Sequence, residues 1–300
     1  NPDPLCRELR AKLAIHEGVP AEQILCGNGA ADLIFRLVWA KKPRRALVTA
    51  PTFAEYATAL ESVGCTVERF FLREQEDLAV TDAFCAAIRP GVDMVFLCQP
   101  NNPTGQLTAL PMVEQILHRC AACGTLLVVD ECFLDFLPDH ALHTAKGLLG
   151  EGDLVILKAF TKLYGMAGVR LGYALSADTA LLEQMQACGQ PWGVSSLAQA
   201  AGLAALEETA YVENVRALIA EQRPRLTAGL RALGLRVLDG RANYLLFQAP
   251  ETLGEALRQR GAVLRSCANY PGLGPGWYRT AVRTGPENEQ LLKLLAEVLE

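Results

Sequence analysis

Three charged residues each follow an apolar run, where a folded chain could bring them together. Asp130 ends the run at 126–129, Lys162 is expected in a loop after the run at 154–157, and Arg170 comes eight residues after Lys162. A lysine amine can form an imine with an aldehyde, a carboxylate can keep a ring nitrogen protonated, and an arginine can bind a phosphate through two hydrogen bonds. Each residue alone is more often a capping residue or a solvated charge. Together they suit a phosphorylated aldehyde cofactor.

Two glycine- or proline-containing turns and one aromatic residue could supply the other parts of such a site. The segment Cys26–Asp32 precedes a helix expected from about residue 33, so its exposed backbone amides could hold a phosphate at the positive end of the helix. A third glycine is missing, so this is not the dinucleotide fingerprint. Asn102 could donate to a ring oxygen and Phe53 could stack on a ring, the alternatives being an Asn-Pro turn and a core aromatic. These parts fit pyridoxal-5′-phosphate (PLP).

The elements that must position these residues alternate along the first 210 residues. Short apolar runs predict strands at 46–49, 94–98, 126–129, 154–157 and 171–174, and amphipathic stretches predict helices at 53–63, 81–88, 112–120 and 179–188. Such alternation is typical of an α/β domain with a mostly parallel central sheet and helices on both faces. Ligands of such sheets bind at the carboxyl ends of strands. The segments to search are therefore 51–56, 99–105, 130–136 and 158–170.

The last third of the chain has a different pattern. A long helical stretch from Tyr211 to about Leu233, interrupted by Pro224, resembles a connector. Strands are expected at 235–238, 244–248, 263–266 and 277–283, with helices at 253–260 and 287–299. We therefore expect a large cofactor-binding domain over residues 1–210, and a connector helix with a small C-terminal α+β domain over residues 211–300.

Composition excludes several classes of function. The net charge is −5 and charged residues make up 20% of the chain, which gives no basic surface for nucleic acid or anionic membranes. The apolar runs are far shorter than the roughly 20 residues that span a bilayer. Charged residues near the start argue against a secretory signal, so a cytoplasmic location is expected. The ten cysteines include one CxxC pair, Cys120 and Cys123, for which core packing is the expected role and no metal is expected.

The order and spacing of these segments resemble those of a known family. The motifs are GNGA, PTF, NNPTG, DECF, TK and GVRLGY, and the resemblance is to fold-type I PLP-dependent transferases, namely class I/II aminotransferases of the histidinol-phosphate aminotransferase group. The segments RSCANYPGL and WYRTAVR are more similar to the threonine-phosphate decarboxylases of that family, which serve cobalamin biosynthesis. The likeness covers essentially the whole chain.

The resemblance implies roles for particular residues. Lys162 and Asp130 would be catalytic, as the Schiff-base lysine and the partner of the ring nitrogen. The further PLP contacts that it implies are Gly29, Ala30, Phe53, Asn102 and Arg170. A small phosphorylated amino acid is the implied substrate, and the implied ligands for it are Asn102, Arg265, Arg279 and Arg283. Arg283 stands where glycine is usual, and a solvated strand residue is its equally plausible role. A homodimer is the implied assembly.

Three departures from the family pattern bear on the reaction. Phe133 replaces a tyrosine usual in the aminotransferases, which favours decarboxylation. Ala159 replaces a serine or threonine that contacts the cofactor phosphate, so either Thr161 supplies this hydroxyl or one phosphate contact is lost, at a cost of roughly 1 kcal/mol. Family members begin with an N-terminal arm that contributes substrate contacts, and this chain starts at Asn1 where that arm would end.

We therefore expect this protein to be a lyase. The chain would convert O-phospho-L-threonine into (R)-1-aminopropan-2-yl phosphate and carbon dioxide. A PLP-dependent aminotransferase acting on histidinol phosphate or another amino acid is the alternative. A PLP-binding regulator is a third possibility, but no basic helix-turn-helix is visible in the sequence.

Overall fold

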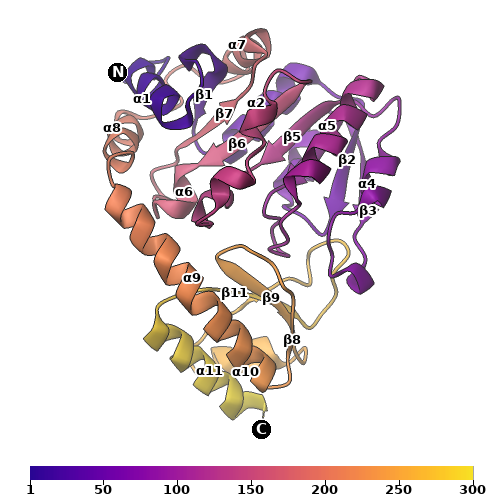
Figure 1. Cartoon of the computed structure of the whole chain (residues 1–300), viewed down its shortest axis with the longest axis vertical. Coiled ribbons are helices and arrows are strands. Elements are labelled where there is room, and N and C mark those ends of the chain that lie inside the picture. The colour runs from indigo at the N-terminus through magenta and orange to yellow at the C-terminus, as the bar shows by residue number, and fades with distance from the viewer. Residues whose placement is uncertain (300) are drawn as a thin grey trace.

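A computed structural model describes residues 1–299, which form two lobes connected by helix α9 (Thr209–Ala232), as Figure 1 shows. The larger lobe holds a seven-stranded sheet with the order β1-β7-β6-β5-β4-β2-β3. Its strands are β1 (Ile24–Gly27), β2 (Arg45–Ala50), β3 (Thr66–Phe71), β4 (Met94–Cys98), β5 (Leu126–Asp130), β6 (Leu154–Ala159) and β7 (Gly172–Leu175). All neighbouring pairs are parallel except the two that involve β7. The predicted mostly parallel α/β fold is confirmed.

Helices cover both faces of this sheet, because successive strand residues point to opposite sides. Val129 packs into one core cluster with α1 (Arg7–Glu17), α4 (Asp82–Ala87), α5 (Leu110–Cys123) and α8 (Ser196–Ala205). Val128 packs into the other with α2 (Ala30–Lys41), α3 (Glu55–Glu61) and α7 (Thr179–Ala187). None of the helices within residues 1–299 combines enough length with enough apolar surface to cross a bilayer.

The predicted strands and helices are largely found, with differences at the edges of the sheet. Strand β4 occupies the predicted residues, and β5 and β6 extend one or two residues beyond them. Strands β1 and β3 were not predicted. They lie at the two edges of the sheet, and β3 is largely solvent-accessible, so its sequence TVERFF lacks a continuous apolar run. Strand β1 is buried throughout, but it has only four residues, ILCG, which is too short a run to give a clear strand pattern.

The smaller lobe has a four-stranded antiparallel sheet with the order β10-β11-β9-β8. Its elements are β8 (Arg236–Val237), β9 (Tyr244–Gln248), α10 (Leu253–Arg258), β10 (Arg265–Ser266), β11 (Trp277–Ala281) and α11 (Gly285–Leu299). Helices α9, α10 and α11 pack on one face, as Figure 1 shows. The expected interruption at Pro224 is wrong, because α9 continues through it. Leu226 and Leu230, in the helical turns that follow Pro224, are fully buried. Their packing outweighs the roughly 3 kcal/mol cost of an internal proline.

A buried ionic cluster lies on the α1 side of the large sheet. The Lys158 ammonium is 2.8 Å from an Asp135 carboxylate oxygen and 3.4 Å from one of Glu17. Glu17 also pairs with Lys146 at 3.0 Å and accepts a hydrogen bond from the Tyr173 hydroxyl. Burial alone would raise the pKa of the Glu17 carboxyl, but Lys158, Tyr173 and Lys146 together lower it to about 2. Glu17 is therefore a charged residue that links α1 to β6 and β7.

We expect Glu17→Gln to destabilise the protein by about 3 kcal/mol at neutral pH, because it removes one partner of the buried Lys158 ammonium. The Glu17 pKa is lower in the folded state than in the unfolded state, so this stabilisation is present above about pH 4 and is lost as the pH falls toward 2. Urea denaturation across this range should show the two proteins converging in acid. Glu8→Gln, at an exposed position on the same helix, is the control, and an equal effect there would contradict the prediction.

Candidate active site

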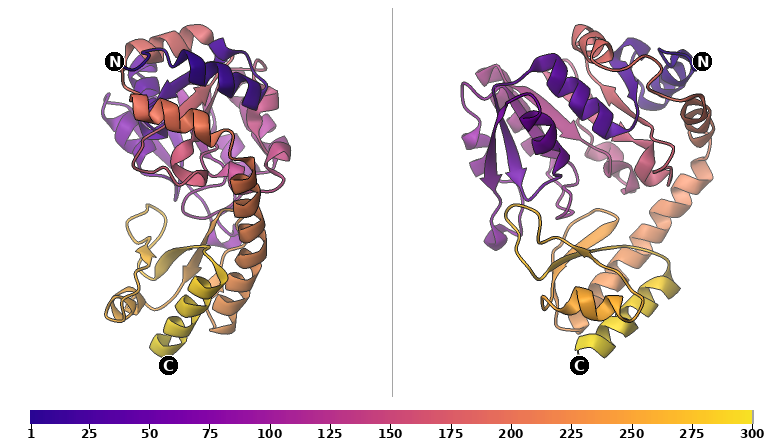
Figure 2. Two further views of the ribbon diagram at one scale, coloured as in Figure 1. Left: turned by 90° about the vertical axis from the view of Figure 1, so that its left-hand side faces the viewer. Right: turned by 180° about the vertical axis from the view of Figure 1, so that it is seen from behind.

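The loops that follow β2, β4, β5 and β6 line one cavity together with the start of α2, because the carboxyl ends of parallel strands meet at one edge of a sheet. In both views of Figure 2, the loops of the smaller lobe lie beneath the large lobe. Seven of the residues predicted to bind a cofactor line this cavity, namely Ala30, Phe53, Asn102, Asp130, Thr161, Lys162 and Arg170. The eighth, Gly29, lies against Arg170.

Asp130 ends β5 and is only 5% exposed. The Tyr56 hydroxyl donates to one of its oxygens at 2.6 Å, and the Cys132 amide donates to the other at 3.0 Å. Burial and the Asp130 charge raise the pKa of Tyr56 well above its usual value, so this hydroxyl stays protonated and remains a donor. The two donors orient the carboxylate in place of water. Asp130 can therefore present a negative charge to a group in the cavity.

Lys162 lies in α6 (Phe160–Leu163), a single helical turn that follows β6 directly. The expectation that it lies in a loop is wrong, because buried Phe160 and Leu163 hold this turn against the protein. The Tyr211 hydroxyl also donates to the Leu163 carbonyl at 3.0 Å. The Lys162 amine is accessible and lies 5.1 Å from the centre of the Phe133 ring. It is the amine that the cavity offers for covalent attachment.

The phosphate cradle is built from close backbone approaches. Helix α2 begins at Ala30, about three residues earlier than predicted, so the Ala30 amide is in its first turn. Gly29 has a φ of 85°, and a Cβ there would lie 2.7 Å from Nη2 of Arg170. A Cβ on Gly172 would lie 2.7 Å from the Ala30 nitrogen. A guanidinium and a helix N-terminus beside side-chain-free backbone suit a phosphate group.

Asn102 joins the cavity to the smaller lobe. Its side-chain oxygen accepts hydrogen bonds from Nη1 of Arg279 and from the Tyr270 hydroxyl, the latter at 3.5 Å. With the oxygen occupied, the amide group of this buried side chain is left to donate to a ligand. Asn102 can thus contact a cofactor and orient Arg279 at the same time.

The predicted substrate arginines line a second cavity that adjoins the first. Arg265 and Arg279 are paired across β10 and β11, and both line this cavity with Lys162 and Phe133. Arg265 donates to the Asn269 side chain at 3.0 Å. Arg283 lines the same cavity, but its side chain is 66% exposed and forms an ion pair with Glu287 at 3.0 Å. The structure therefore brings Arg265 and Arg279 toward Lys162, whereas the Arg283 charge already has a partner.

Sequence reasoning did not identify three tyrosines that organise the site. Tyr56 reaches Asp130 from α3, Tyr270 reaches Asn102, and Tyr244 lies under Arg279 with its ring centre 4.9 Å from the guanidinium carbon. Tyr56 falls in a segment that we had selected for search, but nothing local shows that its ring points into the core. All three contacts join residues that are far apart in the chain.

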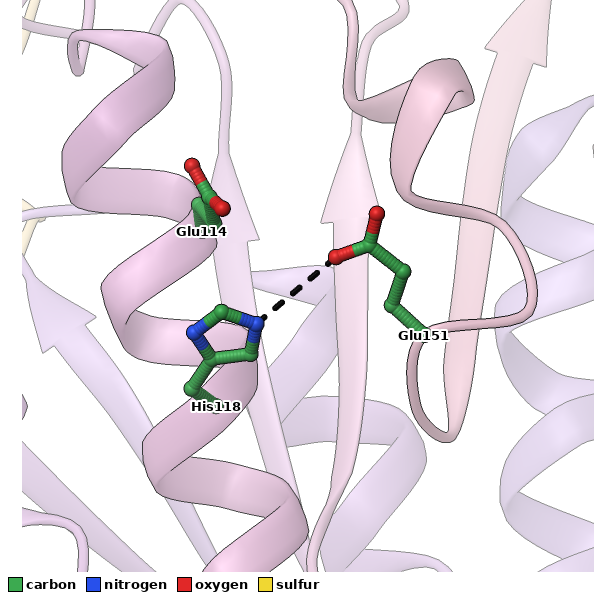
Figure 3. Close-up of side chains that lie close together, drawn as sticks. All are labelled: Glu114, His118 and Glu151. Carbon is green, nitrogen blue, oxygen red and sulfur yellow. Dashed lines mark ion pairs between the residues drawn. The ribbon is translucent and has the colours of Figure 1, made fainter.

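A separate group of possible metal ligands combines α5 with the segment before β6 (Figure 3). Glu114 and His118 lie on α5, Glu151 precedes β6, and their ligand atoms lie within 4.8 Å of one another. His118 is 3.6 Å from Glu151, and all three side chains are exposed. We describe this group as a solvated surface ion pair with a neighbouring carboxylate. In the CxxC pair, Cys120 is buried in the core.

Comparison with known proteins gives one consistent result. The family model "Aminotransferase class I and II" matches residues 4–298. Threonine-phosphate decarboxylase of Salmonella typhimurium is 40% identical over 99% of this chain and 83% of its own length. Histidinol-phosphate aminotransferase of Symbiobacterium thermophilum is 36% identical over 99% and 82%. The crystal structure of histidinol-phosphate aminotransferase from Clostridium acetobutylicum has a TM-score of 0.93 at 26% identity, covering 99% of this chain and 90% of that one.

We expect Gly29→Ala to weaken PLP binding by about tenfold or more, because the new Cβ would displace the Arg170 guanidinium from the cradle. Titration of the apoprotein with PLP, followed by cofactor absorbance, measures the dissociation constant. Gly18→Ala is the matched control, since Gly18 also has a positive φ of 67° but no atom lies within 4 Å of its Cβ position. If both variants weakened PLP binding equally, the assignment of Gly29 to the phosphate site would be wrong.

Proposed function

Because the chain belongs to the aminotransferase class I and II family, we propose that it is a PLP-dependent decarboxylase of O-phospho-L-threonine. The products would be carbon dioxide and (R)-1-aminopropan-2-yl phosphate, an intermediate for cobalamin biosynthesis. The observation that carries the proposal is the 40% identity, over 99% of the chain, to a threonine-phosphate decarboxylase. Phe133, in place of the tyrosine usual in aminotransferases, also supports it.

PLP is the cofactor, and the cavity has the donors that it requires. The chemistry that PLP supplies when bound is an electron sink for the pair released when a bond at the substrate Cα breaks. Lys162 would hold it covalently, and the Gly29 and Ala30 backbone with Arg170 would bind its phosphate. Phe53 would lie against the ring. Thr161 lines the same cavity and can replace the hydroxyl that is missing at Ala159.

The buried polar groups would hold protons where the reaction needs them. Asp130 is fixed by its hydrogen bonds from Tyr56 and Cys132, so its charge would keep a proton on the ring nitrogen. The Asn102 amide would donate to the oxygen at ring position 3. Hydrogen bonds already hold both side chains in place, and preorganised donors and charges of this kind stabilise developing charge.

The arginines would orient a substrate with two anionic ends. Arg279, held by Asn102, would bind the α-carboxylate, and Arg265 would bind the phosphate of phosphothreonine. Binding both ends determines which Cα bond is presented for cleavage, because geometry and not affinity alone selects the bond that breaks. After carbon dioxide leaves, Lys162 would return a proton to Cα.

An aminotransferase is the second candidate function. The 36% identity to a histidinol-phosphate aminotransferase over 99% of the chain favours it. The same residues would then support removal of the Cα proton instead of carbon dioxide, and Lys162 would be the base.

We also propose a cytoplasmic homodimer. Trp39, Trp192 and Leu197 are large apolar side chains that remain exposed in the single chain, and exposed apolar surface is typical of subunit contacts. Light scattering of the PLP-loaded protein distinguishes a dimer from a monomer.

The PLP-loaded protein should release carbon dioxide from O-phospho-L-threonine and form one equivalent of the amino phosphate without a keto acid. Carbon dioxide capture and mass spectrometry of the products measure this directly. Accumulation of pyridoxamine phosphate with a keto acid would overturn decarboxylation in favour of transamination. Lys162→Ala should lose both the activity and the visible absorbance of the bound cofactor.

Arg265→Ala should raise the KM for phosphothreonine by about 10- to 100-fold, because it removes charge-assisted hydrogen bonds to the phosphate. Arg283→Ala should change KM by less than about threefold, because its exposed ion pair with Glu287 contributes little. Steady-state kinetics of the two variants test the assignment. A larger KM effect at Arg283 would transfer the phosphate role to that residue.

A further inference from the structure

The small sheet presents one face to the large lobe, and Tyr244 lies on that face with the substrate arginines. Arg279 pairs with Leu246 in β9, and Tyr244 lies two residues before Leu246, so both side chains project to the same side. The alternate residues of the same strand, Leu245 and Phe247, point to the other side, into the core with α9 and α11. Tyr244 therefore stands between the two lobes.

Tyr244 contacts three different parts of the site and is only 4% exposed. Its hydroxyl donates to the Asn101 carbonyl at 2.9 Å, directly before Asn102. Its ring centre lies 4.9 Å from the Arg279 guanidinium carbon and 5.1 Å from the Phe133 ring, which it meets edge to face at 85°. Each contact involves a different segment of the chain.

These contacts form a continuous series across the cleft. The Phe133 ring that meets Tyr244 also lies 5.1 Å from the Lys162 amine. Arg279, on the other side of Tyr244, donates to Asn102. Arg279 is thus held between an aromatic face and an amide oxygen, and the same aromatic residue supports the ring beside Lys162.

We propose that Tyr244 is a positioning residue that sets the place of the Arg279 guanidinium relative to Asn102 and Lys162. Tyr244 is not assigned a contact with substrate or cofactor. It acts through the side chains of Arg279 and Phe133. Its ring holds Arg279 by a cation–π contact, and its hydroxyl fixes the ring to the Asn101 backbone. The proposal rests on the proposed function for the choice of substrate and for Arg279 as the ligand of its carboxylate.

Two substitutions separate the ring from the hydroxyl. Tyr244→Leu removes both contacts, whereas Tyr244→Phe keeps the aromatic face under Arg279 and loses only the bond to Asn101. Tyr278 provides a matched control, because it lies in the same sheet on the opposite face and is also 4% exposed. Its hydroxyl donates to the Glu251 carbonyl at 2.7 Å, so Tyr278→Leu removes an equivalent buried tyrosine.

The readout is the affinity of the PLP-loaded protein for propionate, followed by competition against substrate and by cofactor absorbance. Propionate carries a carboxylate but no amine or phosphate, so its binding reports on Arg279 whichever reaction the protein catalyses. We expect Tyr244→Leu to weaken propionate binding and raise the phosphothreonine KM by about tenfold. Tyr244→Phe should recover most of this loss. Tyr278→Leu should lower the melting temperature without changing propionate affinity.

Two results would overturn the assignment of Tyr244. One is unchanged propionate affinity in Tyr244→Leu, and the other is an equal loss in Tyr278→Leu, which would indicate a general effect of a damaged sheet. Failure of the unmodified protein to decarboxylate phosphothreonine would refute the proposed function instead, while the propionate series would still decide the role of Tyr244.

Discussion

The Asp130 carboxylate is placed at the end of a strand in the middle of the large sheet, where little water reaches it. A charge in this position requires hydrogen-bond donors and, in a functional site, an opposite charge. The Tyr56 hydroxyl and the Cys132 amide supply the donors, and Tyr56 must itself be buried to reach the carboxylate. The ring of Tyr56 stacks on Phe96 at 4.7 Å, so this polar requirement is built into the hydrophobic core.

A second acidic residue directly follows the end of β5, and its side chain lies on the other side of the sheet from Asp130. Glu131 follows Asp130 and is fully buried, where it accepts hydrogen bonds from Thr144 and from the Ala145 amide. Burial raises the pKa of Glu131 to about 7, although Lys158 opposes this effect. Asp130 therefore faces the cavity, whereas Glu131 belongs with the ionic cluster that joins α1 to β6. Two neighbouring carboxyl groups have different environments because they point to opposite sides of the sheet.

The two lobes are joined at the cleft by backbone as well as by side chains. The Arg241 amide donates to the Gly105 carbonyl at 2.6 Å, and a Cβ on Gly240 would lie 2.5 Å from the Gly105 carbonyl carbon. This close approach brings β9, with Tyr244, against the loop that carries Asn102. Arg279 can then reach Asn102 although 177 residues separate them in the chain. Substrate and cofactor contacts are in this way positioned by one interface between the lobes.

The sequence by itself determined the α/β class, the family and the segments that meet at the cleft. Apolar strands and the residues at their ends are local features, so β4 and β9 were predicted at their observed bounds and Lys162, Asp130 and Arg170 could be selected. Their roles in catalysis stay predictions. Tertiary structure decided the continuation of α9 through Pro224, the edge strands and the contacts of Tyr56 and Tyr244. These features depend on which surfaces pack together, and contacts between distant residues leave no periodic pattern in the sequence.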